Sequence, residues 1–174
     1  MPDAGRFIVL EGGEGAGKST QAALLSAWLE ESGMEHILAR EPGGTEVGEA
    51  IRSVVLGRTD LDVPPVSELF LILAARAAFV KEVVRPALEA GTVVVADRFA
   101  LSTLAYQGYG RGLPLDRVRE ANRIATGGLE PDLYLVLDVE VERGSVRQLR
   151  QGKSPDRMEG AGPAFLKRVR DGYL

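Results

Sequence analysis

Cysteine is absent from this 174-residue chain, and histidine occurs only once. Without thiols the chain can form neither a disulfide nor a thiolate metal site, which suits a reducing compartment. Long apolar runs are missing as well, and none approaches the roughly 20 residues that a membrane-spanning helix needs. The first residues also lack the basic and then apolar layout of a signal peptide. We therefore predict a soluble, cytoplasmic protein without a membrane partner.

An excess of positive charge is lacking too. The formal net charge is −4, which argues against a broad nucleic-acid-binding face. Hydrophobic residues make up 45% of the chain, enough for a folded protein with one sizeable core. A chain of this length corresponds to one domain of ordinary size. We therefore expect residues 1–174 to form a single domain with no nucleic-acid partner.

Four short apolar runs are the predicted strands. Each run is continuous rather than alternating, as expected for parallel strands that are covered on both faces. The runs span residues 7–10, 36–39, 92–96 and 133–137. Helical patterns lie between them, which indicates right-handed β-α-β units. The sequence therefore predicts an α/β protein with a three-layer α/β/α fold, in which helices flank a parallel sheet.

The helical segments differ in length and in how they end. In the first, Leu25 and Leu29 recur at helix spacing beside Trp28, and we expect Trp28 to lie in the core. A longer helix is predicted from about residue 66 to 89, with a kink at Pro86. No apolar run follows the fourth strand. We therefore expect a four-stranded sheet without the fifth strand that would cover its edge.

A glycine-rich loop follows the first predicted strand. It matches G-x-x-x-x-G-K-[ST] over residues 12–19, between a strand and a helix, which is the setting that this motif requires. The glycines permit backbone conformations in which successive N–H groups converge on an anion. Lys18 would neutralise phosphate oxygens of a nucleotide, and the Ser19 hydroxyl would bind Mg²⁺. The predicted ATP-binding residues of this P-loop are Gly12, Gly13, Glu14, Gly15, Ala16, Gly17, Lys18, Ser19 and Thr20.

An acid at the end of the third predicted strand belongs with this loop. The apolar run there ends in Asp97, and in open parallel sheets ligands bind outside the carboxyl ends of the strands. A carboxylate at that position can hold magnesium directly or through water. We therefore predict Mg²⁺ as the cofactor that accompanies ATP, with Ser19 and Asp97 as its protein partners.

Further motifs select among the many functions that a P-loop supports. They are the segments Phe7–Thr20, Arg40–Thr45, Asp97–Phe99, Ser102–Gly108, Pro131–Leu133 and Asp156–Glu159. On these segments the chain resembles the thymidylate kinase family along nearly its whole length. The resemblance implies phosphoryl transfer from ATP to dTMP, which forms dTDP for dTTP biosynthesis. It also implies that the chain acts as a homodimer.

The same resemblance implies roles for residues around the acceptor nucleotide. Glu14 resembles the acid that hydrogen-bonds the 3′-hydroxyl of the acceptor sugar. Arg98 resembles the arginine that binds the acceptor phosphate, and its planar fork suits phosphate oxygens. Arg76 resembles the arginine that reaches O4 of thymine. The implied substrate-binding residues are Glu14, Glu41, Pro42, Arg76, Arg98, Ser102, Tyr106 and Gln107.

The polar stretch after the fourth strand resembles the lid of this family, which closes over the phosphates. We expect the lid at about residues 140–162, followed by a short amphipathic helix over residues 163–173. Because residue 15 is glycine, the chain resembles the type in which the lid supplies the catalytic arginine. Arg157 would instead orient the lid through ion pairs. The implied catalytic residues are Lys18, Arg98, Arg147 and Arg150, with Arg147 and Arg150 as the candidates from the lid.

Departures from the family pattern leave two alternatives open. Ile72 stands where the family usually has an aromatic residue, and Ala78 stands where glutamine is common. These positions motivate a nucleoside monophosphate kinase of another base preference. The family also continues past the position of Leu174, so a truncated, inactive nucleotide-binding homologue is the second alternative. The chain has no [NT]-K-x-D or D-x-x-G motif, which argues against a GTPase-like switch.

Overall fold

The computed structural model describes residues 5–152 and 156–174; residues 1–4 and the predicted lid residues 153–155 lie outside this part. One sheet contains β1 (Phe7–Gly12), β2 (His36–Arg40), β3 (Val93–Asp97) and β4 (Leu133–Leu137). Their order is β2-β3-β1-β4, and each neighbouring pair is parallel. The predicted strands and the parallel four-stranded sheet are therefore confirmed.

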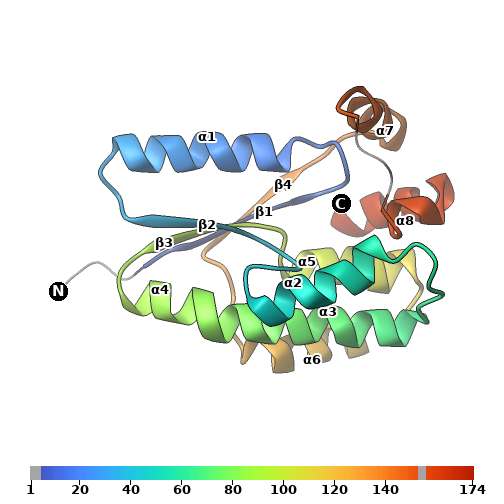
Figure 1. The fold of residues 1–174 in the computed structure, drawn as a ribbon, viewed down its shortest axis with the longest axis horizontal. Helices are drawn as coiled ribbons and strands as arrows, with labels where there is room; N and C mark the ends of the chain where they lie inside the picture. Colours follow the sequence, from blue (N-terminus) through green and yellow to red (C-terminus); the bar gives the residue numbers. More distant parts are fainter. Residues whose placement is uncertain (1–4, 153–155) are drawn as a thin grey trace.

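Helices cover both faces of this sheet (Figure 1). Helix α1 (Lys18–Glu31) lies alone on one side of it. The other side carries a helical layer made of α2 (Glu46–Arg52), α3 (Pro65–Phe79), α4 (Arg85–Glu89) and α6 (Leu115–Thr126). This arrangement confirms the predicted three-layer α/β/α fold.

The two faces of the sheet are packed by alternate residues of the same strands. Val94 and Ala96 of β3 pack with Phe79 and Val84, in the core between the sheet and the larger helical layer. Val95 packs on the opposite face, against α1. Because neighbouring strand residues point to opposite faces, a strand that is buried on both sides must be apolar throughout. This explains the apolar runs of the two central strands, β1 and β3.

The expectation that all four strands are covered on both faces was wrong for the edge strands: Leu38 of β2 is 47% exposed, and so is Leu133 of β4. These strands lie at the two edges of the sheet, where fewer neighbours cover them.

The predicted helix over residues 66–89 is present but changes its winding. Helix α3 continues into a π-helical turn, η2 (Val80–Val84), and then into α4. Pro86 lies in the first turn of α4, directly after the widened turn. Proline lacks the N–H that a regular helix would use there, and its ring crowds the preceding turn. The expected kink is thus a widened turn just before Pro86.

One core assignment from the sequence was wrong. The side chain of Trp28 is 55% exposed and that of Leu24, one helical turn earlier, is 60% exposed. Helix α1 has the sheet on one side only, so it can bury only one stripe of side chains. Ala22 and Leu29 occupy that stripe. Trp28 and Leu24 share a different face, which the helix turns away from the sheet.

The chain after β4 forms helices beyond the carboxyl ends of the strands (Figure 1). Helix α7 (Val141–Arg150) comes first, then a 3₁₀ turn (Glu159–Ala161), and then α8 (Pro163–Tyr173). The predicted helix over 163–173 is confirmed. Its apolar side buries Phe165 and Val169 in a cluster that also contains Tyr106. Within the described residues, no helix is both long and apolar enough to cross a membrane.

Candidate active site

A cavity of about 670 Å³ lies where β1, β2 and β3 end. The P-loop, the segment after β2, the turn after β3, helix α3 and helix α7 all contribute to its wall. The predicted residues that line it are Glu14, Gly15, Gly17, Lys18, Ser19, Thr20, Glu41, Pro42, Arg76, Asp97, Arg98, Ser102, Tyr106, Gln107 and Arg147. Gly12, Gly13, Ala16 and Arg150 are not part of the wall.

Lys18 is buried at the base of the P-loop. Its Nζ donates hydrogen bonds to the carbonyl oxygens of Gly12, at 3.1 Å, and Gly13, at 2.8 Å. Gly17, just before α1, has a φ of 100°, a conformation that a residue with a side chain rarely adopts. Burial, reinforced by the charge of Arg98, lowers the pKa of Lys18 to about 8. The ammonium group is therefore poised for an anion that would replace its lost solvation.

Ser19 and Asp97 meet at the edge of the cavity. The Ser19 hydroxyl donates to the Asp97 carboxylate at 2.8 Å, although the two residues are 78 positions apart. A hydroxyl and a carboxylate are oxygen ligands of the kind that Mg²⁺ prefers. No group of three or more His, Cys, Asp or Glu side chains suited to a metal occurs in residues 5–152 and 156–174. The pair therefore fits a metal whose other ligands come from phosphate and water.

Arg98 makes hydrogen bonds through both of its terminal nitrogens. Its Nη1 donates to the Gly12 carbonyl at 3.1 Å, the Ser102 hydroxyl at 3.2 Å and the Tyr173 hydroxyl at 3.0 Å. Its Nη2 forms an ion pair with Glu14 and a 3.1 Å hydrogen bond to the Tyr106 hydroxyl. Burial raises the pKa of Glu14, but Arg98 and Lys18 outweigh it and hold that pKa below its usual range. Glu14 is therefore a carboxylate at neutral pH.

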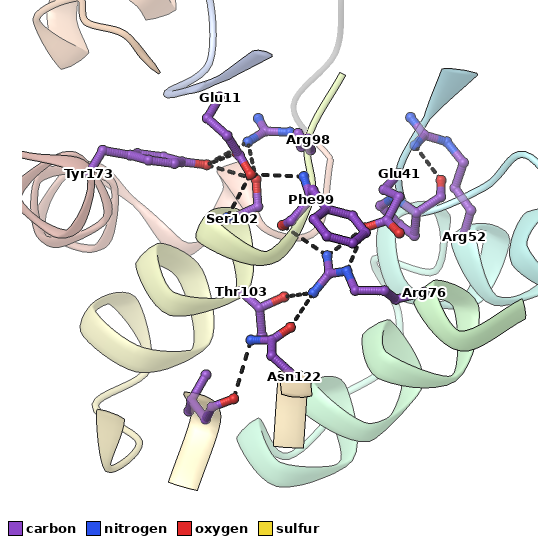
Figure 2. Close-up of polar contacts among 12 residues, drawn as sticks. Glu11, Glu41, Arg52, Arg76, Arg98, Phe99, Ser102, Thr103, Asn122 and Tyr173 are labelled. Atoms are coloured by element: carbon purple, nitrogen blue, oxygen red, sulfur yellow. Dashed lines mark hydrogen bonds and ion pairs between the residues drawn. The ribbon is translucent and has the colours of Figure 1, made fainter. Parts of the chain in front are cut away.

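Two residues of this cluster were missed by the sequence reasoning. The buried Glu11 carboxylate accepts hydrogen bonds from the Ser102 hydroxyl at 2.6 Å and the Tyr173 hydroxyl at 3.1 Å (Figure 2). Tyr173 comes from the last turn of α8. The sequence could have indicated Glu11, because this glutamate directly follows an apolar strand and a buried charge needs partners. Tyr173 carried no such signal.

Arg76 does not present a free N–H group to the cavity. Its Nε and Nη2 donate to Glu41 at 2.7 and 2.5 Å, and Nη2 also donates to the Phe99 carbonyl at 2.9 Å. Its Nη1 donates to Thr103 and Asn122, both at 2.6 Å (Figure 2). These five bonds match the five N–H groups of a guanidinium. In this conformation Arg76 holds α3, the turn after β3 and α6 together.

Glu41 offers the cavity one polar atom without a partner. Its Oε2 is bound to Arg76, whereas its buried Oε1 accepts no hydrogen bond from the described residues. Burial raises the pKa of Glu41, although the neighbouring Arg76 opposes that shift. A buried oxygen without a donor is costly unless a ligand or water supplies one. The residue lines the cavity, so a bound ligand can satisfy it.

A third buried carboxylate lies at the far end of the cavity. Glu68 of α3 is fully buried and accepts a hydrogen bond from Gln107 Nε2 at 2.8 Å. It also pairs with Arg111 at 2.9 Å and with Arg157 at 2.5 Å. Arg157, which follows α7, is therefore tied to α3 by an ion pair. Glu68 was not predicted as a site residue, since nothing in the sequence near it distinguishes it from a surface acid.

Helix α7 contacts the P-loop through two glycines. A Cβ on Gly15 would collide with the backbone of Gly144, and one on Gly144 would collide with the carbonyl of Glu14. This close approach brings the side chains of α7 to the loop. Arg147 Nη1 donates to the Gly15 carbonyl at 3.1 Å, and Gln148 Nε2 donates to Glu14 Oε2 at 3.0 Å.

Two further arginines line the cavity near the segment after β2. Arg52 of α2 donates to the Pro42 carbonyl at 2.9 Å (Figure 2), and burial together with the charge of Arg40 lowers its pKa. Arg40 is paired with Glu49 at 3.2 Å. Arg52 was not among the site residues predicted from the sequence. The feature of the sequence that could have indicated it is a basic residue at the end of the helix that follows the Arg40–Thr45 motif.

Comparisons with known proteins agree with this geometry. The family model for thymidylate kinase matches residues 10–174. A thymidylate kinase of Pelotomaculum thermopropionicum is 48% identical over 170 residues, which cover 98% of this chain and 79% of that protein. One from Nitratidesulfovibrio vulgaris (strain Miyazaki F) is 49% identical over 174 residues, covering 97% of this chain and 81% of that protein.

Solved structures give the same result. A crystal structure of thymidylate kinase from Ehrlichia chaffeensis matches this fold with a TM-score of 0.77 at 32% sequence identity. The match covers 98% of this chain and 83% of that chain. The family model, the relatives and the fold all extend over nearly the whole chain, and we conclude that it belongs to the thymidylate kinase family.

Proposed function

We propose that this chain transfers the γ-phosphoryl group of ATP to dTMP and so forms ADP and dTDP for dTTP biosynthesis. One observation carries the proposal beyond family membership. A single cavity is lined both by the P-loop Lys18 and by Arg98, which stands at the end of the neighbouring strand. Two phosphorylated ligands can therefore meet between these cations, as direct phosphoryl transfer requires.

In the proposed reaction the P-loop binds the donor. Its backbone N–H groups and Lys18 hold the β- and γ-phosphates, while Arg98 holds the acceptor phosphate. An acceptor oxygen attacks the γ-phosphorus in line, and the bond to the β-phosphate oxygen breaks without a covalent enzyme intermediate. The cations reduce the repulsion between the two phosphorylated ligands and stabilise the charge that moves toward ADP.

The Arg98–Glu14 ion pair suggests how the acceptor enters. A phosphate group carries more negative charge and more acceptor oxygens than a carboxylate, so the acceptor phosphate would take the place of Glu14 on Arg98. The released Glu14 carboxylate can then accept a hydrogen bond from the 3′-hydroxyl of the sugar. Ser102, Tyr106, Gln107, Pro42 and Glu41 would surround the rest of the acceptor, and Arg76 would support the base side of the site.

We infer that Ser19 and Asp97 hold Mg²⁺ as part of the ATP complex. The metal would neutralise phosphate charge, which is the chemistry that it supplies in this class of reaction. The same proposal assigns residues 140–162 as the lid, with Arg147 and Arg150 as its catalytic arginines. When the lid closes, its arginines would face the γ-phosphate and exclude water that otherwise hydrolyses ATP.

We also infer a single-domain, cytoplasmic enzyme that acts as a homodimer. Val66 and Phe70 support the dimer: they are one turn apart on α3 and are 52% and 63% exposed. Large apolar side chains that share an exposed face are typical of protein interfaces.

A coupled ADP-release assay tests the proposed reaction. The chain is supplied with ATP, Mg²⁺ and one of dTMP, dUMP, dCMP or dGMP at saturating concentrations. We expect dTMP to be the preferred acceptor and dTDP to appear in step with ADP. Preference for another base would contradict the proposed substrate, while nucleotide binding without any transfer would favour an inactive homologue.

A further inference from the structure

Arg98 has a backbone conformation that side chains rarely adopt. Its φ is 79°, and no other non-glycine residue in the described part of the chain has a positive φ. Such a conformation is unfavourable for a residue with a Cβ, and it persists only where neighbouring groups hold it. Arg98 connects the end of β3 to α5 (Ala100–Thr103). The groups that hold this turn therefore determine where the Arg98 guanidinium points.

The Glu11 carboxylate holds the turn from the neighbouring strand β1. Its Oε1 accepts hydrogen bonds from the backbone N–H of Phe99 at 2.8 Å and of Ser102 at 3.1 Å (Figure 2). Its Oε2 accepts the Ser102 hydroxyl at 2.6 Å. These bonds span the residues that follow Arg98, so the left-handed turn cannot relax without breaking them. Glu11 itself is fully buried and does not line the cavity.

The Tyr173 hydroxyl of α8 contacts Glu11, Ser102 and Arg98. It lies 3.1 Å from Glu11 Oε2, 2.8 Å from the Ser102 hydroxyl and 3.0 Å from Arg98 Nη1. Four donors converge on the Glu11 carboxyl, and an ionised carboxylate can accept from all of them. When Ser102 and Tyr173 donate to Glu11, their oxygen lone pairs remain for Arg98 Nη1. The carboxylate thus turns two hydroxyls into acceptors for the guanidinium.

The two terminal nitrogens of the Arg98 guanidinium therefore have different kinds of hydrogen-bond partner. Nη1 is held by the backbone carbonyl of Gly12 and by the hydroxyls of Ser102 and Tyr173, which their own hydrogen bonds to Glu11 keep in place. Nη2 carries the Glu14 ion pair, which phosphate oxygens can replace. We propose that Glu11 and Tyr173 are positioning residues that fix one end of Arg98 and leave the other end for the acceptor phosphate. The proposal rests on the proposed function, in which Arg98 binds that phosphate.

The Tyr173→Phe variant tests this role, because it removes one oxygen and keeps the ring. Isothermal titration calorimetry measures the Kd of two ligands, dTMP and thymidine, which differ only in the phosphate. We expect the Kd of dTMP to rise about five- to tenfold. The Kd of thymidine should change by less than twofold. In turnover assays the KM for dTMP should rise while the KM for ATP stays within twofold.

Tyr109→Phe is the matched control. Tyr109 is partly exposed, its ring lies against Gly172 of α8, and its hydroxyl forms no hydrogen bond within the described residues. The control should bind both ligands as the unmodified chain does. Equal losses of dTMP and thymidine affinity in Tyr173→Phe would overturn the proposal, since they would indicate a general structural defect. Unchanged dTMP affinity would overturn it as well.

A double-variant experiment asks whether Tyr173 acts through Arg98. In an Arg98→Met background, the Tyr173→Phe change should weaken dTMP binding no further. An additional loss of similar size in that background would overturn the proposal. Glu11→Gln should give a phosphate-selective loss at least as large as Tyr173→Phe, because it also loosens the turn. If Glu11→Gln does not fold, the Tyr173 variants still decide the question.

The same measurements separate this inference from the proposed function. If the unmodified chain transfers phosphate to dTMP but Tyr173→Phe behaves like it, only the positioning role is lost. If the unmodified chain binds dTMP more tightly than thymidine but transfers no phosphate, the catalytic proposal fails. A phosphate-selective loss in Tyr173→Phe would still support the positioning role.

Discussion

Lys18 shows how the fold changes the chemistry of a single side chain. Burial, with the charge of Arg98, lowers its pKa from 10.5 to about 8, while Glu14 and Asp97 oppose the shift. Because the folded-state pKa lies below the unfolded one, the unfolded chain binds more protons between about pH 8 and 10.5. The contribution of Lys18 to folding stability therefore rises with pH across that window. Below it both states are protonated and the contribution is constant.

ATP binding should depend on the same proton. Phosphate oxygens favour the charged ammonium, so binding above pH 8 must be accompanied by proton uptake at Lys18. We expect the Kd for ATP to change little near pH 7 and to rise by about tenfold per pH unit between about pH 8 and 10. Calorimetry in two buffers with different ionisation enthalpies measures the uptake. Lys18→Arg should remove the dependence, because arginine stays charged. A flat profile in the unmodified chain would contradict the assignment.

Glu68 determines which end of the Gln107 amide faces the cavity. Burial raises the pKa of Glu68, but its bonds to Arg111, Gln107 and Arg157 outweigh this and lower it. The group is therefore a carboxylate, which can only accept, so Gln107 must direct its NH₂ toward it. Gln107 lines the cavity, and because its NH₂ end is bound to Glu68, its amide oxygen is the end left for a ligand. An acceptor at this place suits the N3–H of thymine and opposes N3 of cytosine.

We predict that Glu68→Gln weakens this selectivity, because a neutral amide allows Gln107 to turn over. The ratio of kcat/KM for dTMP over dCMP should fall by about tenfold. Arg111→Met provides the comparison: it should destabilise the chain by about 1–3 kcal/mol in urea unfolding, yet keep the ratio, because the Gln107–Glu68 bond remains. If both variants change the ratio equally, Glu68 acts through stability and not through Gln107.

At the scale of elements, the position of α7 follows from the absence of side chains at Gly15 and Gly144. Their backbones touch, so α7 lies directly on the P-loop. Arg147 is three residues after Gly144, close to one helical turn, and its guanidinium reaches the Gly15 carbonyl. Arg150 is a turn further on and does not line the cavity. Of the two arginines proposed from the sequence, the geometry therefore favours Arg147.

The two lid arginines should accordingly differ in their effect on the chemical step. We expect Arg147→Ala to lower kcat by about a hundredfold or more, since it removes a cation that in the proposed reaction would face the transferring phosphate. Arg150→Ala should lower kcat by less than about fivefold. Single-turnover measurements with saturating ATP and dTMP report the chemical step directly. A larger effect from Arg150→Ala than from Arg147→Ala would mean that Arg150, and not Arg147, approaches the phosphates when the lid closes.

At the scale of the whole molecule, the apolar surface is distributed unevenly. Helix α3 exposes Val66 and Phe70, and helix α1 exposes Leu24 and Trp28 on the opposite side of the sheet. The proposed dimer uses the α3 side, where α2 and α6 pack beside the long helix. A charge placed there would have to be buried without a partner on association.

We therefore predict that Phe70→Glu shifts the protein from dimer to monomer. Light scattering at micromolar concentration measures the mass, and circular dichroism checks that the helices remain. Leu24→Glu is the control, because it adds the same charge to an exposed leucine on α1. Dissociation by Leu24→Glu alone would place the interface on the other side of the sheet. A monomeric unmodified chain would contradict the homodimer itself.

The sequence alone determined the features that depend on neighbouring residues. Four continuous apolar runs predict parallel strands, and all four strands form, although only the central strands β1 and β3 are buried as expected. The P-loop is likewise local: its glycines, Lys18 and Ser19 stand together in the chain, and their spacing indicates phosphate binding. The amphipathic helix at residues 163–173 was predicted for the same reason. The periodicity of neighbouring residues is therefore enough to predict a single helix or strand.

Only the tertiary structure decided which distant side chains meet. Glu11 and Tyr173 are 162 positions apart, yet both hold Arg98, and nothing near Tyr173 in the chain indicates this. Arg76 was expected to face a base, but Glu41, Thr103 and Asn122 take up most of its N–H groups. A buried guanidinium must be satisfied by whatever acceptors the fold brings to it. Those acceptors come from other elements, so their positions depend on how the layers pack and not on the local sequence.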